Sequence, residues 1–298
     1  MADPGSSRFS GSGGDAEGGD GGDDLVNGSA AGGHAAGDDA AGGKAAGDAP
    51  GDDAAGDDAY APEVRTVGTT LALHFSPTQI QSRMSLLSPD ALDLEYPRLM
   101  MGFLLFNSSP ARISMVGLGG GSLPKFCHRH LPETCIDVVE IDSAVIALRE
   151  TFRVPPESAR FTVVQGDGAQ YVAEMADATD VLLVDGYGPS GIPAALCSQA
   201  FYADCHAALR EAGMLVLNFH VEHPLYETYL DRVRAAFGAS MFEVVDDDMT
   251  NSVVFACKGD LLDDLDQLEV RRPSTLTRDA WRQLMPTFKV MAATLVPR

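Results

Sequence analysis

The sequence predicts an α/β fold built on a doubly wound, mostly parallel sheet, and three observations support this. Short apolar runs alternate with helical segments from residue 111 to about residue 257, a pattern typical of a parallel sheet covered by helices on both faces. A glycine-rich turn follows the first apolar run, and Glu140 lies near the end of the second. A strand, a glycine turn, a helix and a second strand ending in an acid form the mononucleotide-binding half of a Rossmann-like fold.

Seven strands are expected in this sheet, at 112–116, 136–141, 161–165, 181–185, 214–219, 242–245 and 253–257. Helices are expected between the first six of them, near residues 122–130, 143–152, 168–176, 196–212 and 225–238. Only a short acidic turn joins the last two strands, so the last strand is expected to be antiparallel. Two further helices are expected near 260–268 and 276–285.

The segment upstream of the sheet has a different character. Two β-branched stretches, 64–75 and 79–87, are separated by Ser76 and Pro77 and predict a small N-terminal β-hairpin. Ser88 and Pro89 predict the start of a helix, as N-cap and first helical residue. The apolar run 96–106 predicts a buried helix.

These patterns divide the chain into four parts. Residues 1–62 consist almost entirely of Gly, Ala, Asp and Ser and repeat an Ala-Ala-Gly-Asp unit, so they are expected to form a disordered acidic tail. Residues 63–110 hold the hairpin and the buried helix. Residues 111–259 form the nucleoside-binding domain, and residues 260–298 form the C-terminal helices.

Charge and cysteine content narrow the class of protein. The net charge is −22, and no basic block interrupts the acidic sequence, which argues against a nucleic-acid partner. The five cysteines are scattered and form no CxxC pair, as in a reducing compartment. We see no signal peptide and no apolar run long enough for a membrane span, so the expectation is a cytoplasmic protein with no membrane contact.

The glycine turn is the first candidate site. Gly117, Gly119 and Gly121 allow a tight turn and a close approach of backbone to ligand, and Glu140 is placed to accept hydrogen bonds from both ribose hydroxyls. A nucleoside-type ligand is therefore expected. The alternative is a turn that only packs helix against sheet.

The ends of the next two strands supply further candidates. Asp167, followed by Gly168, is a candidate contact for the exocyclic amine of adenine, with a helix cap as the alternative. Asp185 ends an apolar strand, where a carboxylate is costly unless it binds something, so it is the candidate catalytic residue. The glycine- and proline-rich loop after it resembles a lid and carries Tyr187, a candidate substrate contact. No cluster with metal-ligand spacing has a matching second pair, so no metal is expected.

Four motifs together resemble the spermidine synthase family, also called polyamine aminopropyltransferases. They are 116–124 with its glycine run, Val139-Glu-Ile-Asp142, Gly166-Asp-Gly168 and the Asp185 loop. Gln81 falls where the family has a Gln in its N-terminal β-region, and Tyr96 falls where it has the Tyr of a Tyr-His-Glu-Met segment. The resemblance covers about residues 64–258 and is greatest to the bacterial spermidine synthase-like branch.

The resemblance implies a class I S-adenosylmethionine-dependent methyltransferase fold that binds decarboxylated S-adenosylmethionine as co-substrate. Glu140 would hold the ribose, Asp167 the adenine, and Asp185 would match the catalytic aspartate. The implied reaction transfers an aminopropyl group to a small amine acceptor, in polyamine biosynthesis. Family members are often dimers, which makes a homodimer an expectation that no feature of this chain specifies.

The chain also departs from the family pattern. Acids that grip the amine groups in the family are replaced here by Gly120, Gly188 and Arg98, whereas the nucleoside-binding residues are intact. Two alternatives therefore stay open: a methyltransferase that uses intact S-adenosylmethionine on a small metabolite, and a non-catalytic nucleoside-binding protein.

Overall fold

The computed structural model describes residues 61–75, 80–263, 265 and 268–295. Apart from residues 61 and 62, the expected disordered tail lies outside the described residues, as does the break at Ser76 and Pro77. Within the described part of the chain, no helix has the length and apolar character needed to cross a membrane.

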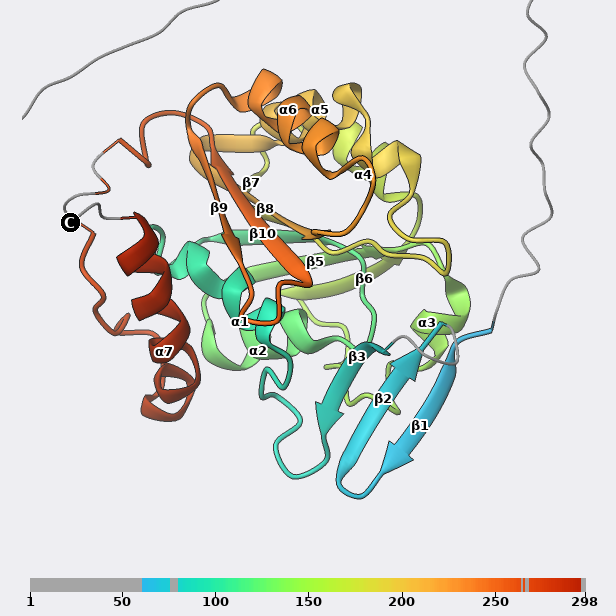
Figure 1. Cartoon of the computed structure of the whole chain (residues 1–298). Coiled ribbons are helices and arrows are strands. Elements are labelled where there is room, and N and C mark those ends of the chain that lie inside the picture. The colour runs from blue at the N-terminus through green and yellow to red at the C-terminus, as the bar shows by residue number, and fades with distance from the viewer. Residues whose placement is uncertain (1–60, 76–79, 264, 266–267, 296–298) are drawn as a thin grey trace, which may run out of the picture. The chain divides into compact units, whose positions relative to one another are not determined.

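The seven-stranded sheet is present, with strand order β6-β5-β4-β7-β8-β10-β9 (Figure 1). Its strands are β4 (Arg112–Val116), β5 (Cys135–Glu140), β6 (Phe161–Gln165), β7 (Thr179–Val184), β8 (Leu209–His220), β9 (Met241–Val245) and β10 (Asn251–Cys257). The five strands β4 to β8 are paired in parallel, and β10 is antiparallel to both β8 and β9. The strand order reverses between β4 and β7, so ligands are expected at the carboxyl ends of these two strands.

Helices cover both faces of the sheet, as the apolar strands require. One face carries α4 (Gly168–Ala173), α5 (Gln199–Ala208) and α6 (Tyr226–Phe237), which lie together above the sheet in Figure 1. The other carries α1 (Glu95–Met100), the 3-10 helix η1 (Met101–Leu105), α2 (Ser122–His130), α3 (Ser143–Ala147) and α7 (Arg278–Leu295). A second 3-10 helix, η2 (Ala194–Cys197), precedes α5.

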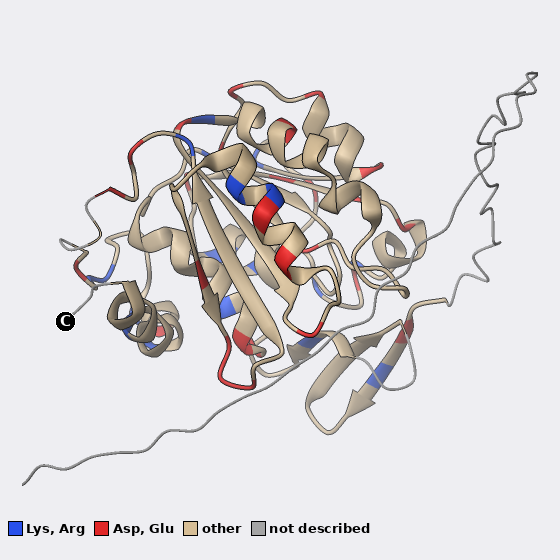
Figure 2. Cartoon of the chain, turned by 45° about the horizontal axis from the view of Figure 1, so that its top comes forward, with Lys and Arg blue, Asp and Glu red and all other residues tan. Residues whose placement is uncertain are grey.

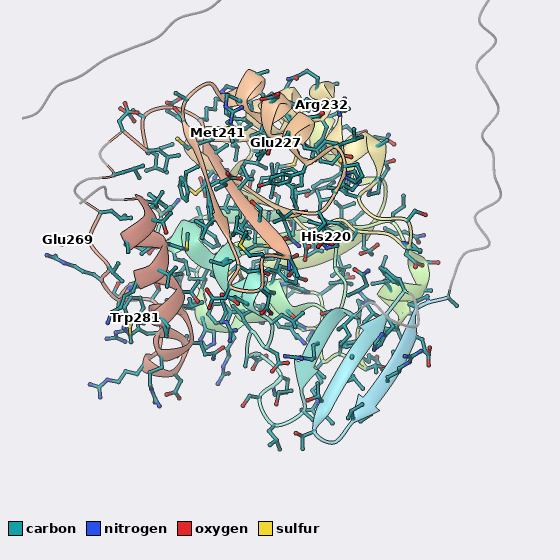
Figure 3. All side chains as sticks on the ribbon, viewed as in Figure 1. His220, Glu227, Arg232, Met241, Glu269 and Trp281 are labelled. Atoms are coloured by element: carbon teal, nitrogen blue, oxygen red, sulfur yellow. The ribbon has the colours of Figure 1, made fainter. Side chains whose placement is uncertain are left out.

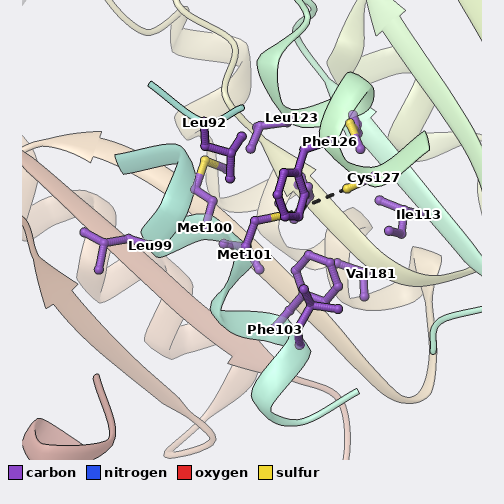
Figure 4. Packing of buried hydrophobic residues seen from close by; sticks show 14 of the residues in the cluster. Leu92, Leu99, Met100, Met101, Phe103, Ile113, Leu123, Phe126, Cys127 and Val181 are labelled. Atoms are coloured by element: carbon purple, nitrogen blue, oxygen red, sulfur yellow. Dashed lines mark hydrogen bonds between the residues drawn. The ribbon is translucent and has the colours of Figure 1, made fainter. Parts of the chain in front are cut away.

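Side chains that alternate along each strand form two separate cores. In β7, Val181 and Leu183 belong to the core under α1 and α2, whereas Leu182 and Val184 belong to the core under α5 and α6. The first core continues into η1 and α2, where Met101 and Cys127 lie next to each other (Figure 4). Burial on both faces explains why these strands are apolar throughout.

The N-terminal region is a three-stranded antiparallel sheet instead of the expected hairpin. Its strands are β1 (Glu63–Val67), β2 (Thr70–His74) and β3 (Ile80–Ser85), in that order. The stretch 64–75, interpreted as one strand, turns at Gly68, which has a φ of +58°. A left-handed φ is readily adopted by glycine, so this turn had a signal in the sequence.

Several helix predictions need correction. No helix begins at Ser88; residues 88–91 form a turn in which Ala91 N–H donates to the Ser88 carbonyl, and the helix starts at Glu95. The buried helix 96–106 is confirmed as α1 and η1. The helix expected at 196–212 ends at Ala208, because the chain from Leu209 pairs with β7. The helix expected at 260–268 falls partly outside the described residues, and α7 is longer than the predicted 276–285.

Candidate active site

A cavity opens at the carboxyl ends of β4, β5 and β7, under the edge of the N-terminal sheet. Of the ten residues that the sequence marks as candidates, nine line it: Gln81, Tyr96, Gly117, Gly119, Glu140, Asp167, Gly168, Asp185 and Tyr187. The tenth, Gly121, is the N-terminal cap residue of α2 and has a φ of +69°. Residues more than 100 positions apart in the sequence thus share one cavity, which we call the donor cavity.

Gly117 brings the ends of β4 and β7 together. It has a φ of +95°, and a Cβ atom on it would lie 2.3 Å from the Asp185 carbonyl oxygen. The Asp185 N–H donates to the Val116 carbonyl at 2.9 Å. Any side chain at position 117 would therefore push Asp185 away from the glycine turn, which explains the need for glycine in physical terms.

Glu140 is anchored by backbone groups on both sides. It is 9 % exposed, and its Oε2 and Oε1 accept the N–H groups of Leu118 and Asp142 at 2.8 and 2.9 Å. Because each carboxylate oxygen has a second lone pair, Glu140 holds the glycine turn in place and still has capacity to accept hydrogen bonds from a ligand.

Asp167 caps α4. Its Oδ1 accepts the N–H groups of Ala169 and Gln170 at 2.7 and 3.1 Å, so the alternative of a helix cap is confirmed. Its Oδ2 takes no part in these bonds, and the residue lines the donor cavity. A contact with adenine therefore stays a prediction that is compatible with the cap.

Asp185 lies at the centre of a hydrogen-bonded group. Its Oδ1 accepts from Asn218 Nδ2 at 2.9 Å, and its Oδ2 accepts from the Tyr96 hydroxyl at 3.1 Å. Burial raises the pKa of the Asp185 carboxyl; the bonds from Asn218 and Tyr96 oppose this, and the negative charge of Glu140 adds to it. A carboxylate with a raised pKa and two fixed hydrogen bonds is suited to accept a proton from a bound group.

Tyr187 is held near Asp185 from the other side. Its hydroxyl donates to the Asn218 carbonyl at 3.1 Å, and its ring stacks on His220 with centroids 4.3 Å apart. Burial raises the pKa of the Tyr187 hydroxyl, which therefore stays protonated. The end of β8, where Figure 3 labels His220, thus fixes the first part of the lid loop.

A second cavity, of about 590 Å³, adjoins the first and shares Gln81, Tyr96, Asp185 and Tyr187 with it. Five carboxyl groups and no Lys or Arg line it: Glu95, Asp185, Glu222, Asp246 and Asp248. We call it the acidic cavity. The acidic β9–β10 turn that borders it is visible in Figure 2 at the ends of these two strands.

Sequence reasoning missed most residues of the acidic cavity. Asn218 is a lone polar residue inside the apolar strand β8, a signal comparable to the one that marked Asp185. Asp246 follows β9 directly, but its turn was interpreted only as a connection. Glu95 and Glu222 carry no motif, and only the fold brings them together.

The three departures from the family pattern lie in different surroundings. Gly188 lines the donor cavity and has room for a side chain, since the nearest atom to a Cβ placed on it would be the Gly191 carbonyl oxygen at 3.8 Å. Arg98 lines neither of the two cavities; it borders a third one together with Glu95 and Asp247. Position 120 has no room for a side chain.

Among the described residues, no group of three or more His, Cys, Asp or Glu side chains is placed to hold a metal ion. The carboxylates of the acidic cavity therefore do not converge on a single point.

Comparison with known proteins identifies the family. The spermine/spermidine synthase domain model matches residues 94–250, more than half of the chain. The chain belongs to the spermine/spermidine synthase family. The resemblance, the fold class and the aminopropyltransferase-like function predicted from the sequence are thereby confirmed.

Two individual relatives have names that agree with this family, and a third is named as a methyltransferase. The chain is 38 % identical over 183 residues to a polyamine aminopropyltransferase of Chromobacterium violaceum. These residues are 61 % of this chain and 70 % of the relative. A probable spermidine synthase from Corynebacterium glutamicum has the same fold, with a TM-score of 0.59, 18 % identity, and coverage of 80 % of this chain and 92 % of that one. A human protein named eEF1A lysine and N-terminal methyltransferase is 35 % identical over 121 residues, which are 37 % of this chain and 17 % of that protein.

Proposed function

We propose that this enzyme transfers an aminopropyl group from decarboxylated S-adenosylmethionine to an amine, and that the amine enters through the acidic cavity. The observation that carries the proposal is the place of Asp185, which lines both cavities and is bound by Tyr96 and Asn218. A carboxylate that lines both cavities can orient a nucleophile in one cavity toward the carbon of a donor bound in the other.

The nucleoside would occupy the donor cavity. Glu140 has free lone pairs for the ribose hydroxyls, and Asp167 has its Oδ2 for adenine. Gln81 supports a ligand in the same place, because its Nε2 is a buried donor without a partner in the described part of the chain. A buried unpaired donor is costly, and a ligand acceptor would remove that cost.

The acceptor would meet Asp185 from the acidic cavity. An alkylamine has a pKa near that of Lys, about 10.4, so it arrives as an ammonium ion. The carboxylates attract this cation, and Asp185 accepts the proton that must leave before attack. The amine nitrogen then forms a bond to the carbon next to the sulfonium, the C–S bond breaks, and its electron pair stays on sulfur, giving methylthioadenosine.

The chain's own residues supply orientation and exclusion of water. Tyr96 and Asn218 fix the two oxygens of Asp185, and the lid loop is held by the pairing of Gly188 with Gly191 at 2.8 and 3.1 Å. Placement of both reactants beside one carboxylate provides a large part of the rate in a displacement of this kind.

A second candidate, methyl transfer from intact S-adenosylmethionine, is favoured by one observation. Position 120 cannot carry the acid that would repel the carboxylate of the intact donor, and the Ser82 and Ser122 hydroxyls line the cavity near it. The 35 % identity to a methyltransferase over 121 residues is compatible with this candidate.

Calorimetric titration of both donors into the wild type and Asp185→Asn separates these functions. Tighter binding of the decarboxylated donor, followed by transfer to an amine that Asp185→Asn abolishes, supports the proposal. Tighter binding of the intact donor and methyl transfer to a metabolite extract contradict it and favour the second candidate. Binding of either donor without any transfer indicates a non-catalytic nucleoside-binding protein.

A further inference from the structure

The charge of the acidic cavity exceeds what one or two ammonium groups balance. Its lining carries five carboxyl groups and no Lys or Arg. Burial raises the pKa of Glu95, and repulsion from the nearby negative charges of Asp247 and Asp246 adds to this rise. A ligand with several positive charges would relieve this repulsion.

The carboxylates are spread out. In the described chain, no three acidic or histidine side chains are placed to hold one metal ion. They come from four different places: Glu95 from α1, Asp185 from the end of β7, Glu222 from the β8–α6 connection, and the Asp246–Asp248 pair from the β9–β10 turn. Charges distributed around a cavity suit an extended cation better than a point charge.

Two of these carboxylates have no partner within the described part of the chain. For Glu222 and Asp248, both exposed, the described residues provide no hydrogen bond or ion pair to the side chain. Asp246, in contrast, uses both oxygens to bind Thr250 and Asn251 within its own turn. Glu222 and Asp248 are therefore the carboxylates that are free to bind a ligand far from Asp185.

A buried acceptor independently indicates an N–H ligand. Asn218 is 3 % exposed, lines the acidic cavity, and its Oδ1 has no partner among the described residues. Its orientation is fixed, because its Nδ2 donates to the Asp185 carboxylate at 2.9 Å and a rotated amide would place two acceptors together. The unpaired oxygen can only accept hydrogen bonds, so it suits an N–H group of an amine that is bound next to Asp185.

The volume agrees with a long ligand. At about 590 Å³, the acidic cavity falls in the range of roughly 300–1,000 Å³ that holds drug-sized ligands, which is more than a short diamine fills.

From these observations we infer that the preferred acceptor is a linear polyamine with at least three amino groups, whose reacting nitrogen lies at Asp185 and Asn218 and whose far ammonium groups lie at Glu222 and Asp248. This inference rests on the proposed function, since it names the acceptor of the same reaction. It assigns to Glu222 and Asp248 the discrimination between a triamine and a diamine.

The test compares spermidine, a triamine, with putrescine, a diamine, as acceptors for the same donor. We expect kcat/KM to be about threefold higher for spermidine, since it carries one ammonium group more than putrescine and one additional exposed charge pair is worth about that factor. In the double variant Glu222→Gln/Asp248→Asn, the KM for spermidine should rise about tenfold, because two charge pairs are lost, while the KM for putrescine, which has one far ammonium group, should rise about threefold at most.

A matched control removes two charges elsewhere. Glu227→Gln/Asp260→Asn has the same net charge as the test variant, and both residues are exposed and lie outside the cavity lining. This control should leave the preference for spermidine intact. Equal kcat/KM values for the two acceptors, or an unchanged spermidine KM in the test variant, would overturn the inference.

Binding keeps the inference testable if no amine is turned over. Spermidine and putrescine are then titrated into the enzyme in the presence of methylthioadenosine, and the affinity for spermidine is measured at two salt concentrations. Tighter binding of spermidine that is weakened in the test variant supports the inference even though the proposed function has failed. Equal or absent binding of both amines refutes it.

Discussion

A side chain at position 120 would collide with Ser82: a Cβ atom on Gly120 would lie 2.6 Å from the Ser82 hydroxyl oxygen and 3.0 Å from the Phe152 ring. Ser82 belongs to β3 of the N-terminal sheet, so this sheet occupies the space that a side chain at position 120 would need. The absence of a side chain at position 120 is therefore coupled to the packing of the N-terminal sheet against the glycine turn.

The first prediction concerns this contact. Gly120→Ala should lower the free energy of unfolding by about 1–3 kcal/mol because the added methyl group overpacks the site. Backbone strain does not contribute, since the φ of Gly120 is not positive. Urea denaturation measures it. In a Ser82→Gly background the same substitution should cost less. Gly188→Ala, where the nearest atom is 3.8 Å away, is the control and should change stability by less than about 0.5 kcal/mol.

The second prediction restores a family acid. Gly188→Asp should lower the KM for the decarboxylated donor about fivefold, because position 188 lines the donor cavity, has space, and would add a carboxylate for the donor's aminopropyl ammonium group. Steady-state kinetics with Gly188→Asn as the uncharged control measures the effect. An equal change in both variants would show that charge is not its cause.

The third prediction is a pH profile. Hydrogen bonds from Asn218 and Tyr96 lower the pKa of Asp185 against the effect of burial, so Asn218→Ala and Tyr96→Phe should each raise it. If catalysis needs the carboxylate, activity falls as pH drops through this pKa, and the acidic limb of kcat/KM should move to higher pH in both variants. Tyr187→Phe, whose hydroxyl binds the Asn218 backbone and not Asp185, should leave the limb in place.

The fourth prediction concerns the β9–β10 turn. Asp246 accepts hydrogen bonds from two N–H groups and two side chains of Thr250 and Asn251; burial raises its pKa, but these bonds outweigh burial and the net shift is downward. Because the pKa is lower in the folded state, its stabilisation is present above the unfolded value, about 3.9, and is lost as pH falls through the folded value.

Asp246→Asn should therefore cost about 1–3 kcal/mol of unfolding free energy at pH 7, and the difference from wild type should shrink below pH 4. Chemical denaturation at several pH values measures it. The neighbour Asp248 makes no bonds within the turn, so Asp248→Asn should not change stability; a cost as large as that of Asp246→Asn would contradict the assignment.

The fifth prediction concerns Lys125, which is 1 % exposed and donates to the Phe152 carbonyl at 2.8 Å. Burial lowers its pKa to about 8. The unfolded chain, with a Lys pKa near 10.4, then binds more protons than the folded one between pH 8 and 10, so stability gains from rising pH in this range.

Lys125→Met should abolish this gain. The difference in unfolding free energy between wild type and Lys125→Met, followed from pH 7 to 10, should change in favour of wild type. The exposed Lys289→Met is the control and should show a constant difference. A constant difference for Lys125→Met as well would mean that the ammonium stays protonated in the core.

The sequence by itself determined the α/β class, the seven strands, the glycine turn and the positions of Glu140, Asp167 and Asp185. It did so because these features depend on local patterns: apolar runs, glycine spacing and acids at strand ends have the same meaning wherever the strands lie in the sheet. The turn at Gly68 has a local signal of the same kind, a glycine between two β-branched stretches.

Only the tertiary structure decided which distant side chains meet. The partnership of Asn218 and Tyr96 with Asp185 joins residues 33 and 89 positions away, and the acidic cavity draws its carboxylates from four separate segments. Whether position 120 has room likewise depended on Ser82, 38 positions earlier (120 − 82). Such contacts depend on strand order and packing. Local sequence patterns do not specify which strands pair, so they carry no signal for these contacts.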